Sequence, residues 1–113
     1  MHEASLIQEV LEEAARQARA HGCTGIHLIR LRVGALSGAV PEALEFAFEA
    51  LKAGTPAAAA RLEIEAVPAR ARCRACGREF ALEEPGLPCP SCAGGDTELV
   101  CGRALELARL VAG

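Results

Sequence analysis

The chain has 113 residues, of which 51% are hydrophobic and only 3% are aromatic, and its formal net charge at pH 7 is −3. This length allows one compact domain with a small additional module, and the apolar content is sufficient for an aliphatic core. An acidic chain with few aromatic side chains is a poor candidate for binding nucleic acid, because it lacks both cations for phosphates and rings for base stacking.

The sequence also lacks the features of a membrane or secreted protein. No apolar run approaches the roughly 20 residues of a membrane span. The opening Met1-His2-Glu3 is not the basic start of a signal peptide. We therefore expect a cytoplasmic protein with reduced thiols and no membrane partner.

Residues 5 to 21 are predicted to form an amphipathic helix. Apolar residues recur at three- and four-residue spacing, and the glutamates and arginines fall on other faces. Ser5 and Gln8 have the capping-box spacing, and Gly22 can end the helix. The expected buried stripe consists of Leu6, Ile7, Val10, Leu11, Ala14, Ala15 and Ala18.

A strand, a second helix and another strand follow. Residues 26 to 33 alternate between apolar and polar side chains, as a strand with one buried face does. Pro41 is suited to the first turn of a helix, and Gly54 and Pro56 end it. Residues 61 to 67 alternate again and predict a second strand. The buried stripe of the helix is expected to hold Leu44, Phe48 and Leu51, with Phe46 and Ala47 near it.

The composition changes after Pro68 from aliphatic alternation to Cys, Pro, Gly and charge. Alternation resumes in residues 102 to 111, so this last strand can return to the sheet of the first half. The expected fold is α+β: a small mixed three-stranded sheet with two helices, plus an inserted zinc-ribbon-like four-cysteine module. The expected domains are residues 1–68 with 99–113, and the module at 69–98. Since chains below about 40 residues seldom fold unaided, a metal should order this module.

Four of the six cysteines form two C-x-x-C pairs, Cys73 with Cys76 and Cys89 with Cys92. Two residues between the cysteines allow both thiolates to reach one ion, and two such turns close a tetrahedral sulfur cage that suits Zn²⁺. Two disulfides, a redox pair or an iron site are the alternatives. Gly77 follows the first pair, whereas Ala93 occupies the equivalent position after the second.

The remaining cysteines and histidines have simpler interpretations. Cys23 and Cys101 lack a C-x-x-C partner and are expected to be small buried hydrophobes, although Cys101 could also exchange with the zinc ligands. His27 alternates with apolar residues and is expected to be a hydrogen-bonded core or edge residue. His21 is expected to be a cation at a helix C-terminus or a surface group.

Several segments together resemble the HypA/HybF family of hydrogenase maturation proteins, and the resemblance covers essentially the whole chain in the same order. The segments that carry it are the start Met1-His2-Glu3-Ala4-Ser5, the blocks at 33–37, 41–48 and 62–65, and the two cysteine pairs. Ala93 and Cys101 depart from the family pattern. The resemblance implies a nickel metallochaperone, not an enzyme, with a nickel-binding α/β domain and a zinc module.

The same resemblance implies cargo, targets and partners. Such proteins deliver Ni(II) to the large subunit precursor of [NiFe]-hydrogenase together with a GTPase, HypB, and some also serve urease. A homodimer is left open. Nitrogen donors suit Ni(II) or Cu(II) better than Zn²⁺, and they are available from the amine of Met1, the imidazole of His2 and the amides of His2 and Glu3. The Glu3 carboxylate could tune this set or ligate directly. The alternative is an ordinary solvated His2 near a loose terminus.

Two other functional classes remain to be weighed. A zinc-ribbon module that binds nucleic acid or protein, without nickel, would favour basic and aromatic residues. The module instead holds Arg74 and Arg78 against five acidic residues between positions 73 and 98. A metalloenzyme needs an open metal position, and four thiolates fill a tetrahedron.

Overall fold

The computed structural model describes residues 3–84 and 86–113. Its elements are α1 (Glu3–Ala20), β1 (Ile26–Gly34), α2 (Pro41–Leu51), β2 (Arg61–Val67), β3 (Arg70–Cys73), β4 (Glu79–Ala81), β5 (Thr97–Cys101) and β6 (Leu105–Ala112). The chain forms two compact units. The first comprises the described residues up to Arg32 with Ala39–Glu65 and Glu106–Gly113, and the second comprises Val33–Gly38 and Ala66–Leu105.

Helix α1 buries the stripe that its periodicity predicts. Ile7 and Ala14 are fully buried, and only Leu6 of the predicted stripe is half-buried. The helix begins at Glu3, two residues earlier than expected, because the first turn tolerates an acidic residue next to its free N–H groups. At the other end, Gly22 takes a φ of 72°, and its N–H donates to the carbonyl of Arg19.

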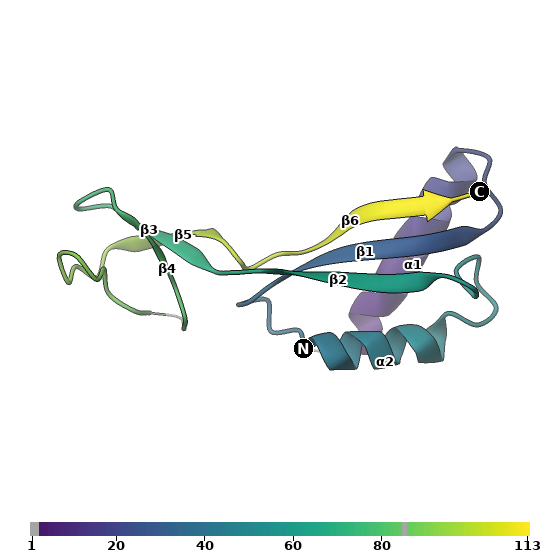
Figure 1. The fold of residues 1–113 in the computed structure, drawn as a ribbon, viewed down its shortest axis with the longest axis horizontal. Helices are drawn as coiled ribbons and strands as arrows, with labels where there is room; N and C mark the ends of the chain where they lie inside the picture. The colour runs from purple at the N-terminus through teal and green to yellow at the C-terminus, as the bar shows by residue number, and fades with distance from the viewer. Residues whose placement is uncertain (1–2, 85) are drawn as a thin grey trace. The chain divides into compact units, whose positions relative to one another are not determined.

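The first unit contains most of a mixed three-stranded sheet in the order β2-β1-β6. Arg30 of β1 pairs with Glu63 of β2 at 2.9 Å, and Arg32 pairs with Glu65 at 2.7 Å. Residue numbers thus increase in the same direction along both strands, so β1 and β2 are parallel. Gly25 and Gly113 exchange backbone hydrogen bonds, as in an antiparallel pair. In Figure 1, α1 crosses behind these strands and α2 runs beside β2.

Three side chains lie differently from expectation. Phe46 was expected near the buried stripe of α2, but its side chain is 78% exposed. Leu51 is 38% exposed, because it stands at the last position of the helix. His27 lies on the central strand with an exposed side chain, although a hydrogen-bonded core or edge residue was expected. Helix α2 therefore buries a narrower stripe, formed by Leu44, Ala47 and Phe48.

The second unit is built on an antiparallel sheet in the order β4-β3-β5. Ala71 on the central strand lies opposite Phe80 on one side and Leu99 on the other. The small core of this unit consists of Ala71, Cys73, Phe80 and Cys89, with Leu82 packed against it. So little apolar material explains why such a module needs a further constraint in order to fold.

The loop after β1 is held against the chain segments that enter and leave the four-cysteine region. The N–H groups of Ala35 and Leu36 donate to the carbonyls of Val67 and Gly102. A Cβ on Gly34 would lie only 2.2 Å from the carbonyl oxygen of Gly102. Glycine is therefore required at position 34, since any side chain would collide with backbone.

None of the helices in the described part of the chain is long and apolar enough to cross a membrane.

Candidate metal centre

The four cysteines of the two C-x-x-C pairs converge in the second unit. Cys73 ends β3 and Cys76 follows in the next turn, whereas Cys89 and Cys92 lie in the connection between β4 and β5. The Sγ atoms of Cys73 and Cys92 are 3.5 Å apart, and those of Cys76 and Cys89 are 3.7 Å apart. All four sulfur atoms lie within 4.8 Å of one another.

These distances fit a tetrahedral metal site. A Zn–S bond of about 2.3 Å places the sulfurs of a regular tetrahedron roughly 3.8 Å apart. All six cysteines are free thiols in the structure. Cys73 and Cys89 are buried and Cys76 and Cys92 are exposed, so the cage has an inner and an outer half. An all-sulfur tetrahedron selects zinc or iron over the harder divalent ions.

The backbone of the two cysteine turns has the same form. The N–H of Gly77 donates to the carbonyl of Cys73, and the N–H of Ala93 donates to the carbonyl of Cys89, each at 2.8 Å. Gly77 has a φ of 78° and Ala93 a φ of 59°. Ala93 is the one non-glycine residue of the described chain with a positive φ, so the alanine adopts the conformation that the missing glycine would supply.

Backbone amides in these turns are directed at sulfur. The N–H groups of Cys92 and Ser91 lower the pKa of the Cys89 thiol to about 7, because they stabilise the thiolate. The N–H of Gly94 acts in the same direction on Cys92, but hydrogen bonds with the neighbouring thiols dominate and raise its pKa to about 11. The backbone of the two cysteine turns thus supplies hydrogen-bond donors to the sulfur atoms of Cys89 and Cys92.

Arginines around the centre are paired with carboxylates of the same unit. Arg70 contacts Glu79 at 2.8 Å, and Arg74 contacts Asp96 at 2.8 Å. Arg78 donates to the hydroxyl of Ser91 at 2.6 Å. Because Arg70, Arg74 and Arg78 each bind a side chain of the second unit, they do not form a free phosphate-binding patch.

Comparison with known proteins shows the family to which the chain belongs. The family described as "Hydrogenase/urease nickel incorporation, metallochaperone, hypA" matches residues 1–112. The chain belongs to the HypA family. It is 41% identical to the hydrogenase maturation factor HypA of Streptomyces avermitilis, over 95% of this chain and 83% of that protein. It is 43% identical to the HypA of Cereibacter sphaeroides, over 95% of each chain.

Solved structures of the family confirm the fold. The solution structure of the Ni metallochaperone HypA from Helicobacter pylori matches with a TM-score of 0.73 at 20% identity, over 99% of this chain and 97% of that chain. A second HypA solution structure matches with a TM-score of 0.75 at 19% identity, over 99% and 96% of the two chains. The predicted α+β fold with a four-cysteine module is therefore confirmed, and the chain is a nickel metallochaperone for hydrogenase maturation.

The predicted nickel ligands of this HypA protein are only partly within the structure. Met1 and His2 lie outside the described residues. Glu3 begins α1, and its Oε2 atom accepts a hydrogen bond of 3.2 Å from the N–H of Val40. Val40 precedes α2 and has no side-chain cap of its own, so Glu3 supplies the acceptor at that helix start. This contact, 37 residues apart in the chain, has no local sequence signal.

The other candidate residues do not join the cysteine cluster. Cys101 is half-buried, and its thiol lies 3.5 Å from the carbonyl of Pro68. Cys23 is also half-buried, so neither lone cysteine is the fully buried hydrophobe that was expected. Among the residues that the structure describes, the grouping of metal-binding side chains is the set of four cysteines.

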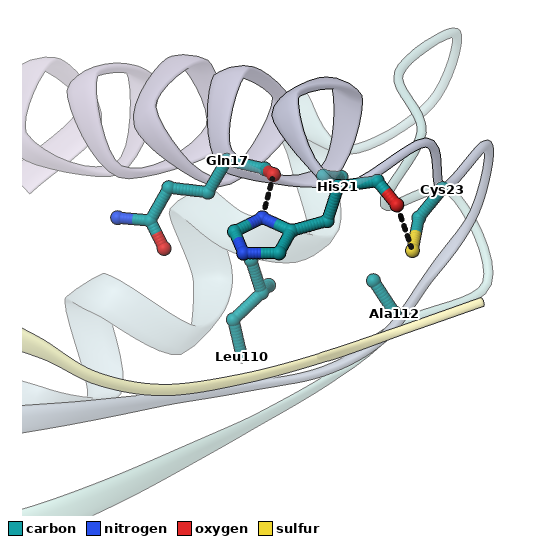
Figure 2. A pocket seen from close by; sticks show the side chains of 6 residues that line it. Gln17, His21, Cys23, Leu110 and Ala112 are labelled. Atoms are coloured by element: carbon teal, nitrogen blue, oxygen red, sulfur yellow. Dashed lines mark hydrogen bonds between the residues drawn. The ribbon is translucent and has the colours of Figure 1, made fainter.

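His21 and Cys23 line a pocket that sequence reasoning did not predict, at the end of α1 beside β6 (Figure 2). Nδ1 of His21 lies 3.0 Å from the carbonyl oxygen of Gln17, which accepts the hydrogen bond. The Cys23 thiol points to the carbonyl of His21 at 3.8 Å. Both side chains are thus directed at backbone oxygens of their own segment, and they do not converge on a common ligand position.

Proposed function

We propose that this HypA protein carries Ni(II) on its N-terminal residues and transfers it to the large subunit precursor of [NiFe]-hydrogenase, while its four cysteines hold a structural zinc ion. The observation that supports this division is the closed sulfur cage. Four sulfurs within 4.8 Å already fill a tetrahedron, so the cargo of a nickel carrier needs a different donor set. Nor does such a site offer the open position of a catalytic metal, so we infer a carrier and not an enzyme.

The N-terminal donors have the chemistry that Ni(II) prefers. The amine of Met1, the amides of His2 and Glu3 and the imidazole of His2 form a nitrogen-rich set suited to tetragonal coordination. The contact between Glu3 and the N–H of Val40 ties the segment that carries these donors to the start of α2. We infer one of two roles for the Glu3 carboxylate. It orients the nitrogen donors from its place on Val40, or it leaves Val40 and ligates nickel itself.

The identity of the structural metal follows from its surroundings. The amides directed at Cys89 favour the thiolate form that binds metal, and the free thiols match the reducing cytoplasm in which we place the protein. We infer zinc, because it is the usual ion of a closed four-cysteine site. We also propose that residues 69–98 form an inserted module whose folding depends on that ion.

The partners follow from the established role in hydrogenase maturation. We infer that a HypB-type GTPase and the large subunit precursor act with this protein, and that urease is a further target to test. A homodimer is a further assembly to test. Pairing of Arg70 and Arg74 with carboxylates of the second unit supports a function without nucleic acid.

The test is isothermal titration with nickel on the wild type, His2→Ala, and a form with one residue added before Met1. The wild type should bind one equivalent, His2→Ala should lose stoichiometric binding, and both variants should keep zinc. The extension should weaken binding because it leaves the imidazole in place but moves the amine. Wild-type binding should also weaken as the pH falls through about 6.5, where an ordinary imidazole gains its proton. Unchanged affinity in the extended form would exclude the amine as a ligand.

A further inference from the structure

Helix α2 leaves an aromatic side chain on the surface of a chain that has few of them. The protein has three phenylalanines and no tyrosine or tryptophan. Phe48 and Phe80 are core residues with 1% and 6% exposure, whereas Phe46 is 78% exposed. Val40, which directly precedes the helix, is 50% exposed. A large ring left in water on a rigid helix is the kind of feature that protein interfaces bury.

Apolar residues on and just before α2 lie outside the buried stripe of the helix. Ala43, Phe46 and Ala50 follow one another at three- and four-residue spacing, so they lie along one side of the helix, where Ala43 is half-buried and Phe46 and Ala50 are exposed. Val40 directly precedes the helix in an extended conformation and adds a further exposed apolar side chain. Phe46 and Ala50 lie away from the core stripe of Leu44, Ala47 and Phe48, and Ala43 stands at its border. The two alanines flank the ring with small side chains, which allows another helix to approach closely on either side of Phe46.

A row of carboxylates runs beside this apolar stripe. Glu42, Glu45 and Glu49 are all exposed and again follow at three- and four-residue spacing. Lys52 reaches Glu49 at 2.9 Å and lies over the ring of the buried Phe48, at the far end of the helix. The surface therefore combines an apolar ridge with a parallel negative edge. We call this surface the Phe46 face, defined by Val40, Ala43, Phe46, Ala50, Glu42, Glu45 and Glu49.

We propose that the Phe46 face docks a basic amphipathic helix of a protein partner in hydrogenase maturation. The apolar ridge requires a partner with an apolar face or groove to receive the ring. The three carboxylates require lysines or arginines along one side of that face. The partner is thus defined by its chemistry: an apolar seam bordered by a row of cations.

The carboxylate row also argues against the other occupants of such a face. In a symmetric pair of copies the same patch meets itself, so the glutamates of both copies would be brought together. Anionic lipid and nucleic acid carry the same sign of charge as the row and would be repelled. A basic protein surface is the occupant that gains from both the ridge and the row.

The position of the face connects it to nickel transfer. Val40 is the residue of the Phe46 face that directly precedes α2, and its N–H donates to the carboxylate of Glu3, the residue after the proposed nickel-binding Met1 and His2. A partner docked on α2 therefore lies next to the chain segment that holds the cargo. This last step rests on the proposed function, whereas the docking surface itself does not.

The test uses two peptide probes with full-length protein. One is an 18-residue helical peptide with leucines on one side bordered by lysines, and the other has glutamates in place of the lysines. The lysine peptide should bind, and it should shift the amide resonances of Ala43, Phe46 and Ala50. Phe46→Ala should weaken that binding by at least about tenfold, the scale of an interface aromatic anchor. Because the ring is exposed, the variant should fold and keep zinc.

Charge reversal and its control complete the experiment. Glu45→Lys with Glu49→Lys should lose the lysine peptide and gain the glutamate peptide. Glu9→Lys, which changes an exposed carboxylate on α1, should lose less than about twofold. Equal binding of both peptides, or an equal loss in Glu9→Lys, would overturn the proposal. Concentration-dependent dimerisation that Phe46→Ala abolishes would overturn it in favour of a second copy.

Two functional readouts separate this proposal from the nickel site. Phe46→Ala should bind nickel as the wild type does, because the variant leaves Met1, His2 and Glu3 intact. Hydrogenase maturation in cells should nevertheless fall, and excess nickel should not restore it. Full maturation by Phe46→Ala would overturn the docking surface, whereas failure of the wild type to bind nickel would overturn only the nickel proposal.

Discussion

Ala93 offers a direct test of how the second cysteine turn is built. It holds a φ of 59°, whereas Gly77 holds 78° at the equivalent position of the first turn. An L-residue in the left-handed region costs about 1–2 kcal/mol, and an alanine recovers about 0.4–1 kcal/mol through its less flexible unfolded state. Ala93→Gly should therefore stabilise the module by roughly 0.5–1 kcal/mol.

Zinc affinity is the appropriate measurement, because metal binding and folding of such a module are one equilibrium. Competition with a chromophoric chelator should show zinc bound about two- to fivefold more tightly by Ala93→Gly. Gly77→Ala is the matched reverse change: its new Cβ would meet no atom within 4 Å, so only the backbone preference is altered. It should weaken zinc binding by a similar factor. Weaker zinc binding in Ala93→Gly would refute this account of the turn.

Three further outcomes test the fold and the cage. The wild type should carry roughly one zinc ion per chain, and Cys76→Ser should lose that ion and leave residues 69–98 open to protease. Full zinc occupancy in Cys76→Ser would contradict the four-sulfur site. Gly34→Ala should lower the free energy of unfolding by about 1–3 kcal/mol in denaturant titrations, because its Cβ would lie 2.2 Å from the carbonyl oxygen of Gly102. An unchanged denaturation midpoint would contradict that close approach. Replacing residues 69–98 by a short glycine-rich turn should leave a folded domain. Deletion of everything from residue 69 should destabilise that domain, because β6 is lost from the sheet. Equal thermal melts of the two forms would exclude an inserted module.

The parts of the structure that sequence reasoning predicted are those with a regular spacing. The two C-x-x-C pairs specify which thiols can share an ion, and the four sulfurs do meet. The stripe of α1 and the alternation of β1 specify which side chains face the core, whereas β2 buries none of its residues fully. The return of the last strand to β1 follows from the same alternation and is observed as β6.

Phe46 shows how residue identity can outweigh spacing in such reasoning. It stands two positions from both Leu44 and Phe48, a rotation of about 200° on an α-helix, which places it away from the core. It was nevertheless expected near the buried stripe. The structure follows the helical geometry, and the exposed ring is thereby marked as a feature to explain.

Other features depended on contacts that no local pattern encodes. The hydrogen bond between Glu3 and Val40 arises because α1 and α2 pack together. The sequence marks Ala93 as a departure, but only the backbone shows that the alanine keeps the turn intact. His27 has the same parity as the buried Ile29, Leu31 and Val33 and is nevertheless exposed, so alternation alone did not predict its burial.

Metal analysis of untagged protein with one added equivalent of nickel tests the central claim most directly, namely that cargo and structural metal occupy different residues. After removal of unbound metal, the wild type should retain about one zinc and one nickel ion per chain. His2→Ala should retain zinc alone, because the four-cysteine cage does not involve His2. Nickel retained by His2→Ala, or nickel bound only as zinc leaves the cysteines, would contradict the account.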